Sequence, residues 1–211
     1  MTPPAIAKDQ IAGVLLAGGR AQRMGGQDKG LIEVAGKPMA EHILDLLRPQ
    51  VGAIVINANR NHERYAAFGY PVVADSIGEF FGPLAGMASA LQATDKEYIL
   101  TVPCDSPLLP TDLAARMAAA LVRDGADIAV AHDGARMQPV FALLRRDLLP
   151  SLLAYLRAGE RKIDLWFARH RTALADFSDS PDIFLNINTP EERAELEAKM
   201  LHDRMPTAER T

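Results

Sequence analysis

The residues best suited to chemistry gather in one short stretch, from Leu16 to Gly30, which holds five glycines together with Arg20, Arg23 and Lys29. Glycines permit positive φ and let backbone N–H groups come close to a ligand, so such a loop can surround phosphate oxygens with donors. Arg23 and Lys29 would then neutralise phosphate charge. The spacing matches neither the P-loop pattern nor the dinucleotide pattern G-x-G-x-x-G. We therefore expect a phosphate site of another kind, and the alternative is a flexible basic surface loop.

A carboxylate, Asp105, stands between two prolines just after the apolar run at residues 98–102. The prolines stiffen the turn, and one carboxylate suits Mg²⁺, which takes its other ligands from phosphate and water. The alternative is a turn-former or a cap for a helix starting near Thr111. A phosphate loop nearby favours the metal. The single cysteine, Cys104, reads as a small buried residue rather than a nucleophile, because no histidine lies near it in sequence.

Amide and carboxylate side chains follow two further apolar runs. Asn57 and Asn59 end the run at residues 53–57, and an amide there can hold a nucleobase or ribose through its donor and acceptor. The alternative, which the pattern alone favours, is a cap for the helix at His62. Asp75 follows the next run and could bind a base edge or ribose, or else form an ordinary Asx turn with Ser76.

Two more segments carry possible ligand groups. Gly82 opens a helix whose N-terminal N–H groups attract anions or base carbonyls, although plain helix initiation explains it as well. Asn186 and Asn188 precede a final helix and could support a metal or phosphate site, or Asn188 could belong to the turn. The histidines show no metal-ligand spacing, and the basic run at residues 157–162 is typical of a solvated helix end.

Elements that could position these residues alternate along the chain. We expect strands at residues 11–17, 53–57, 71–74, 98–102, 127–131, 140–144 and 183–187. We expect helices at 38–47, 62–68, 84–93, 111–123 (with Thr111 as N-cap), 148–157 and 162–169, and a last one opened by a capping box of Thr189 and Glu192. This alternation predicts an α/β fold with a mostly parallel sheet between two helical layers. Ligands in such folds bind beyond the carboxyl ends of the strands, where the loops after Ala17, Asn57, Ala74 and Val102 lie.

Composition limits the class of protein. With 211 residues, 48% of them hydrophobic, the chain suits one domain, which we expect at residues 11–201 between flexible termini at 1–10 and 202–211. A net charge of −4 argues against a nucleic-acid binder. The N-terminus lacks the pattern of a signal peptide, and the apolar runs are too short to span a membrane. The expected location is cytoplasmic.

Taken together, these motifs are similar to a known family. The segments 16–19, 23–26 and 28–30 resemble the signature of nucleotidyltransferases with a GT-A-like Rossmann fold. Adding 36–38, 57–60, 75–76, 82–86, 103–107 and 186–192 gives a closer resemblance to the molybdenum cofactor guanylyltransferases (molybdopterin-guanine dinucleotide synthases), from about residue 11 to residue 196. The resemblance implies a three-layer Rossmann-like fold of the nucleotide-diphospho-sugar transferase type. One departure is Ala21, where relatives often carry Ser or Thr.

The resemblance also implies roles for individual residues. Asp105 matches the Mg²⁺ ligand of the family, and Lys29, Asp105 and Arg23 match its catalytic positions. The implied nucleotide-binding positions are Leu16, Ala17, Gly18, Gly19, Lys29, Asn57, Asp75, Gly82, Asp105 and Asn186.

The implied reaction joins GMP from GTP to the terminal phosphate of molybdenum-bound molybdopterin and releases pyrophosphate, with Mg²⁺. The implied partners are these two substrates, and proteins that insert molybdenum or deliver the cofactor, with no nucleic acid and no membrane. The segment at residues 132–139 could receive the acceptor, with Arg136 or Arg161 meeting its phosphate, though both suit a plain surface role. The alternatives are a cytidylyl- or sugar-phosphate nucleotidyltransferase of the same fold, and a non-catalytic GTP-binding adaptor that delivers the cofactor.

Overall fold

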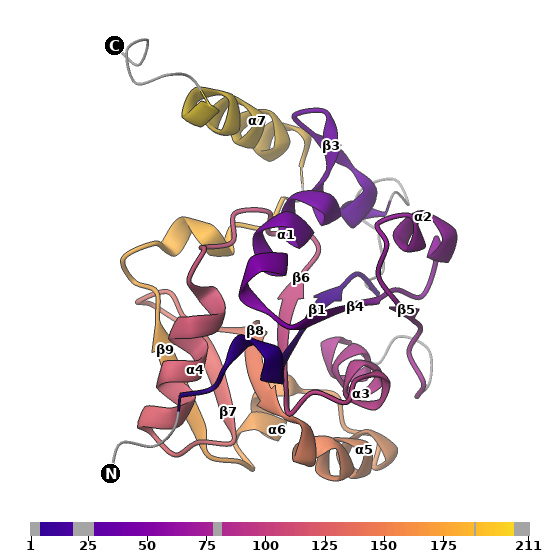
Figure 1. Ribbon diagram of the computed structural model, residues 1–211, viewed down its shortest axis with the longest axis vertical. Helices are drawn as coiled ribbons and strands as arrows, with labels where there is room; N and C mark the ends of the chain where they lie inside the picture. The colour runs from indigo at the N-terminus through magenta and orange to yellow at the C-terminus, as the bar shows by residue number, and fades with distance from the viewer. Residues whose placement is uncertain (1–4, 19–27, 78–81, 188, 205–211) are drawn as a thin grey trace.

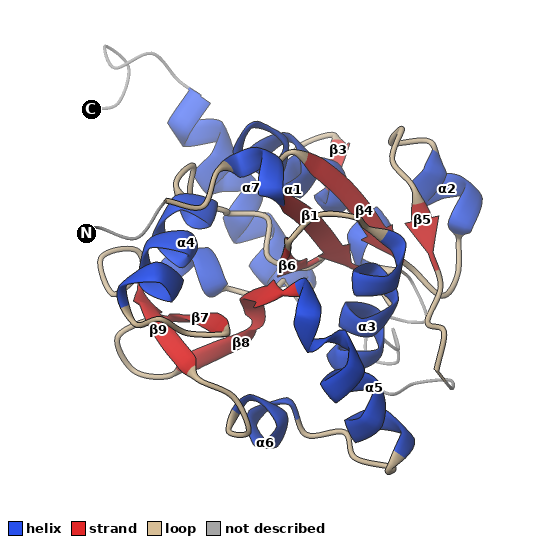
Figure 2. Cartoon of the chain, turned by 60° about the horizontal axis from the view of Figure 1, so that its bottom comes forward, coloured by secondary structure: helices blue, strands red, loops and turns tan. Residues whose placement is uncertain are grey.

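The structure is a computed structural model that describes residues 5–18, 28–77, 82–187 and 189–204. Within these residues, seven strands form one sheet in the order β5-β4-β1-β6-β8-β7-β9 (Figures 1 and 2). Among these seven strands, β8 alone runs antiparallel to its neighbours. The strands are β1 (Ile11–Leu16), β4 (Ala53–Asn57), β5 (Val72–Val73), β6 (Tyr98–Pro103), β7 (Ile128–His132), β8 (Met137–Arg145) and β9 (Thr172–Asp176).

Helices cover both faces of this sheet, because successive side chains of a strand point to opposite faces. In β1, Ile11 and Leu15 pack into the core under one helical layer, while Ala12 and Val14 pack into the core under the other. The first layer holds α1 (Met39–Leu47), α2 (His62–Ala66) and α4 (Leu113–Arg123). The second holds α3 (Pro83–Ala93), α5 (Leu149–Arg157) and α6 (Ile163–Phe167). The expected three-layer α/β architecture is therefore confirmed.

The last helix, α7 (Pro190–Arg204), lies apart from these layers, beside a small hairpin of β2 (Glu33–Val34) and β3 (Lys37–Pro38) (Figure 1). The predicted capping box is confirmed: the Thr189 N–H donates to Glu192 Oε2 at 3.0 Å, and the Glu192 N–H donates to Thr189 Oγ1 at 3.1 Å. The Ala35 N–H donates to Glu197 Oε1 at 3.2 Å, which ties the helix to the hairpin.

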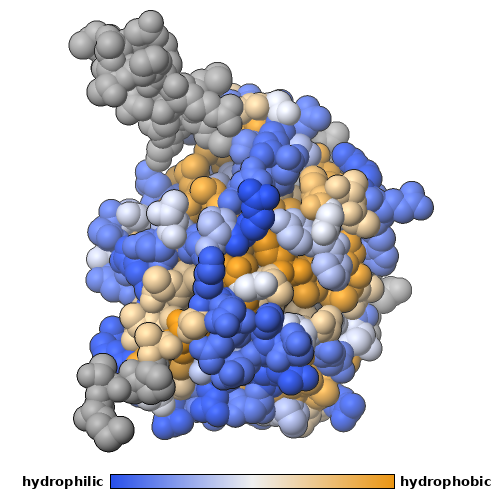
Figure 3. All heavy atoms as spheres, viewed as in Figure 1, coloured by the Kyte–Doolittle hydropathy of each residue, from blue (hydrophilic) through white to orange (hydrophobic). Residues whose placement is uncertain are grey.

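Figure 3 shows both hydrophilic and apolar side chains on the face that it draws. On the face that α1 and α4 cover, apolar side chains gather toward the middle and hydrophilic ones surround them (Figure 3). In the described part of the chain, no helix is both long and apolar enough to cross a membrane.

Two predictions of local structure are wrong, and three strands were not expected. Residues 183–187 form no strand, since a 3₁₀ helix covers Pro181–Phe184; Phe184 instead packs its ring edge-on against Phe141 at 4.9 Å. The apolar run there serves side-chain burial rather than sheet pairing, and Pro181 has no N–H to give to a ladder. Thr111 does not cap α4, because Asp112 holds the N-cap position and makes no side-chain cap bond. β9 and the β2–β3 hairpin were not expected.

Candidate functional site

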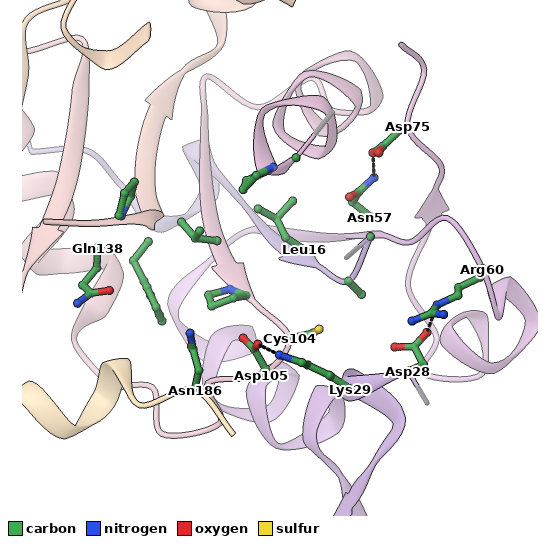
Figure 4. A pocket seen from close by; sticks show the side chains of 18 residues that line it. Leu16, Asp28, Lys29, Asn57, Arg60, Asp75, Cys104, Asp105, Gln138 and Asn186 are labelled. Atoms are coloured by element: carbon green, nitrogen blue, oxygen red, sulfur yellow. Dashed lines mark hydrogen bonds and ion pairs between the residues drawn. The ribbon is translucent and has the colours of Figure 1, made fainter. Parts of the chain in front are cut away.

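A cavity of about 580 Å³ opens at the edge of the sheet where the parallel strands end. It is lined by the residues that follow β1, β4, β5 and β6, by the start of α3, and by the first residues of β8 (Figure 4). The reversed direction of β8 explains its place here, because an antiparallel strand begins where its neighbours end. A volume of this size falls within the range of about 300–1,000 Å³ that is usual for small-molecule sites. The loops that were expected to carry ligand groups, those after β1, β4, β5 and β6, line this cavity.

An ion pair lies in the middle of the cavity. Lys29 Nζ is 3.0 Å from Asp105 Oδ2, and the two side chains are 23% and 17% exposed. Lys29 opens a short 3₁₀ turn, while Asp105 follows β6. The backbone carbonyl of Asp105 accepts a hydrogen bond from the Ile187 N–H at 2.9 Å, which joins the C-terminal segment to this turn. Asp105 therefore directs its carboxylate at the cavity and does not cap α4.

Behind Lys29 lies a buried carboxylate, Asp28, that sequence reasoning missed. Its Oδ1 accepts a hydrogen bond from the Tyr65 hydroxyl at 2.6 Å, and its Oδ2 accepts one from Asn61 Nδ2 at 3.0 Å. Arg60 Nε lies 3.6 Å from the same Oδ2, and Arg60 lines the cavity. Burial raises the pKa of Tyr65, so its hydroxyl stays a donor. These groups hold the backbone that carries Lys29.

The β4 end of the cavity carries a network of two amides and one carboxylate. Asn57 Nδ2 donates to Asp75 Oδ1 at 3.0 Å and to the Val73 carbonyl at 3.2 Å. Asn59 Nδ2 donates to Asp75 Oδ2 at 2.8 Å, and the Asp75 N–H donates back to Asn59 Oδ1 at 2.8 Å. The favoured alternative of a helix cap is therefore wrong for Asn57 and Asn59, since Asn61 holds the N-cap position of α2. Asp75 forms a cross-link between two strand ends rather than an Asx turn with Ser76.

Two glycines shape this end. Gly82, at the N-cap of α3, has φ +72°, a conformation that favours glycine, and it brings the start of the helix to the cavity. Gly86 packs against Asn57: a Cβ there would lie 2.3 Å from Asn57 Oδ1 and 2.8 Å from Leu16 Cδ2. Leu16, Ala17 and Gly18 line the wall between the β4 end and Lys29.

The opposite end of the cavity, at β8, is lined by Gln138, Pro139, Val140 and Phe141. The first two belong to the segment 132–139 that was expected to receive the acceptor, and the last two were not expected. Asn186 also lies here; its Oδ1 accepts a hydrogen bond from the buried Ser106 hydroxyl at 2.6 Å. Figure 4 shows the amide nitrogen of Asn186 beside Asp105.

The two arginines expected to meet an acceptor phosphate lie elsewhere. Arg136 has an 80% exposed side chain, and the guanidinium of Arg161 donates to the carbonyls of Leu156 and Glu160. Among the described residues that line the cavity, neither of these arginines is present.

The donor set restricts which metal could bind. Within the described residues, no three or more His, Cys, Asp or Glu side chains gather as a metal site. One carboxylate beside a lysine in a cavity fits Mg²⁺, which prefers oxygen and takes phosphate and water as further ligands. Cys104 is buried, as expected, and burial raises the pKa of its thiol, which disfavours the thiolate that would act as a nucleophile. The predicted Gly19 and Arg23 lie outside the described residues.

Comparisons with known proteins show which family the chain is similar to. The family described as "MobA-like NTP transferase domain" matches residues 13–174. The molybdenum cofactor guanylyltransferase of Shewanella loihica is 53% identical over 193 residues, covering 92% of this chain and 98% of the relative. That of Shewanella sediminis is 55% identical over 187 residues, covering 89% and 95%.

Solved structures support the fold. Molybdopterin-guanine dinucleotide biosynthesis protein A from Archaeoglobus fulgidus is similar with a TM-score of 0.73 and 19% identity, covering 90% of this chain and 98% of that one. The 4-diphosphocytidyl-2C-methyl-D-erythritol synthase from Anaerococcus prevotii has a TM-score of 0.68 and 15% identity, covering 92% and 98%. At these identities the likeness establishes the Rossmann-like nucleotidyltransferase fold and nothing finer.

Proposed function

The chain belongs to the molybdenum cofactor guanylyltransferase family, and we propose that it transfers GMP from GTP to the terminal phosphate of molybdenum-bound molybdopterin, releasing pyrophosphate. The observation that carries this proposal beyond family membership is the Lys29–Asp105 pair, which lies in the cavity lining between Gln138 and Asn57 (Figure 4). A reaction that joins two anionic substrates needs both to reach one charged centre from opposite sides.

We place GTP at the β4 end. Asp75 and Asn57 supply carboxylate and amide oxygens, and guanine presents N1–H and N2–H₂ as adjacent donors. A site that pairs with those donors leaves its own polar groups unpaired with adenine, and so rejects it. The start of α3 at Gly82 adds N–H groups and the positive end of a helix. Leu16, Ala17 and Gly18 would then lie along the nucleotide, with its phosphates toward Lys29.

We place the molybdopterin at the β8 end, where its terminal phosphate would approach the same centre. A phosphate monoester has a second pKa of about 6, so the attacking oxygen is ionised at neutral pH and needs no strong general base. The work left for the protein is to bring the two phosphates in line and to stabilise the negative charge that builds on the leaving pyrophosphate. Lys29 is suited to the second task. Gly19 and Arg23 are assigned to triphosphate binding on the family resemblance alone.

We assign Asp105 as the residue that holds Mg²⁺, since it is the carboxylate that lies against Lys29 at the cavity centre. When bound, Mg²⁺ supplies positive charge that offsets the repulsion between phosphate groups. Asn186, fixed by Ser106 beside Asp105, is assigned a supporting role at this centre. We also propose that the reaction takes place in the cytoplasm, where GTP is available. Proteins that insert molybdenum and deliver the finished cofactor would act with it.

The proposal is tested by measuring pyrophosphate release with Mg²⁺, molybdenum-bound molybdopterin and each of the four nucleoside triphosphates in turn. Release with GTP alone supports the guanylyltransferase. Release with CTP instead would move the chain to cytidylyl transfer on the same fold. A folded protein that binds GTP and releases no pyrophosphate with any of the four would favour the cofactor-delivery adaptor.

A further inference from the structure

Gln138 is the first residue of β8 that lines the cavity, and an irregularity in the pairing of β7 with β8 places it there. The pairing of β7 with β8 shifts between Val130, which faces Ala142, and Ala131, which faces Gln138. Residues 139–141 therefore bulge out of the ladder, and Pro139 suits this because it has no N–H to leave unpaired. The Thr101 hydroxyl donates to the Val140 carbonyl at 2.7 Å, which fixes the bulge from the neighbouring strand β6. Bulges next to active sites commonly redirect a side chain in this way.

The orientation of the Gln138 amide follows from its partner. Gln138 Nε2 donates to Asp133 Oδ2 at 2.6 Å. An amide that commits its nitrogen to a carboxylate presents its carbonyl oxygen on the other side. Figure 4 shows that oxygen turned toward Asn186 and the rest of the lining, with the nitrogen turned away.

Asp133 is itself held in place. Its Oδ1 accepts hydrogen bonds from the backbone N–H groups of Ala135 and Arg136, each at 2.8 Å. These N–H groups, together with Gln138, lower the pKa of Asp133 to about 2. The carboxylate is therefore ionised at neutral pH and can only accept hydrogen bonds. A rotated Gln138 amide would place its carbonyl oxygen against that carboxylate, so the orientation with the nitrogen toward Asp133 is favoured. The backbone of the turn between β7 and β8 thus determines which atom of Gln138 faces the cavity.

We propose that the Gln138 carbonyl oxygen recognises the acceptor substrate by accepting a hydrogen bond from the N–H edge of its pterin ring, with Asp133 as the positioning residue. This inference rests on the proposed function, which supplies the pterin. A pterin carries an amino group and a ring N–H side by side, and a neutral carbonyl oxygen suits such a donor but not a phosphate. The neighbouring Pro139, Val140 and Phe141 supply apolar surface for a flat ring. The phosphate end of the acceptor is left to the charged centre at Lys29 and Asp105.

The test uses Gln138→Met, which keeps the length of the side chain and removes its hydrogen bonding. With molybdenum-bound molybdopterin as acceptor and saturating GTP, we expect the acceptor KM to rise about tenfold. The Kd for GTP, measured without acceptor, should stay as in the wild type. The matched control is Gln10→Met, because Gln10 also donates its amide nitrogen to a carboxylate, Glu97 at 3.1 Å, at the amino end of β1. Its acceptor KM should not change.

A second variant tests whether Asp133 acts by orienting the Gln138 amide or only by packing against its neighbours. Asp133→Asn lets the Gln138 amide rotate, so it should raise the acceptor KM in the wild-type background and have no further effect in Gln138→Met. Melting temperatures show whether each variant is folded. An unchanged acceptor KM in both folded variants would overturn the inference, and so would equal effects of Asp133→Asn in the two backgrounds. Failure of the wild-type chain to release pyrophosphate would instead contradict the proposed function, and direct binding of molybdopterin to the wild type and to Gln138→Met would then decide the inference.

Discussion

Gly86→Ala sets two opposite effects against each other inside α3. Alanine is the better helix former, and the exchange alone should stabilise the protein by about 0.5–1 kcal/mol. The structure opposes this gain, because the added Cβ would meet Asn57 Oδ1 at 2.3 Å and Leu16 Cδ2 at 2.8 Å. Asn57 is 2% exposed and donates hydrogen bonds to Asp75 and to the Val73 carbonyl, so its side chain cannot move away from the new Cβ without losing these bonds.

The magnitude follows from these contacts. Overpacking a filled interior costs about 1–3 kcal/mol, and displacing the Asn57 amide from Asp75 adds about 1–3 kcal/mol if the partners stay buried and unpaired. Against the helix gain, we expect a net loss of about 1–5 kcal/mol in the free energy of unfolding. Because Asn57 and Asp75 are the proposed guanine-binding side chains, the Kd for GTP should rise about tenfold or more.

The assays are urea unfolding at fixed pH and GTP binding by calorimetry. Ala119→Gly is the control: Ala119 is exposed on α4, so this variant measures the helix preference alone and should leave GTP binding unchanged. A Gly86→Ala protein that is more stable than the wild type and binds GTP normally would refute the packing that we describe around Asn57.

Four further predictions concern the Lys29–Asp105 pair, the hydrogen bond between Tyr65 and Asp28, and Asp133 in the turn between β7 and β8. Asp105→Asn should lower the rate of pyrophosphate release by about 10²-fold or more, and excess Mg²⁺ should not restore it. Lys29→Met should raise the KM for GTP about 10- to 100-fold, whereas Lys37→Met, which breaks only exposed ion pairs with Asp45 and Glu41, should not. Tyr65→Phe removes the hydroxyl that donates at 2.6 Å to a buried carboxylate, and it should cost about 1–3 kcal/mol of stability in urea. The pKa of Asp133 is lowered from 3.8 to about 2 in the folded protein. Ionised Asp133 therefore stabilises the fold at pH values above its pKa in the unfolded chain, and this stabilisation is lost as the pH falls toward 2. The melting temperature of Asp133→Asn should therefore fall less over that range than that of the wild type.

Sequence alone predicted the half of the cavity that parallel strands build. Each of these strands is a short apolar run. Gly18, Asn57 and Asp75 stand at or just after the ends of three of them, and Asp105 follows Pro103 and Cys104 at the end of the fourth, so the end of each run also marks a possible ligand group. That is why Lys29, Asn57, Asp75 and Asp105 were expected at the edge where the structure places them.

The other half was predicted only in part: residues 132–139 were expected near the acceptor, but Gln138 was not singled out, and Val140 and Phe141 were not expected. The apolar pattern of residues 140–144 predicts a strand but not its direction, and direction is what brings Gln138 to the cavity. Pro139 also argues against a strand at that point, since only the bulge makes room for it. The partner of Asp28, Tyr65, stands 37 residues further along the chain, and no periodicity connects the two.

The two halves of the cavity are also held by different means, and this has a consequence for substrate choice. At the β4 end, side chains bond to side chains, so Asn57, Asn59 and Asp75 depend on one another, and changing one should disturb the others. At the β8 end, backbone N–H groups and a bulge hold Asp133 and hence Gln138. Distant sites with no shared partners act additively. Nucleotide preference and acceptor preference should therefore vary independently in this chain, with Lys29 and Asp105 as the two residues whose substitution affects both.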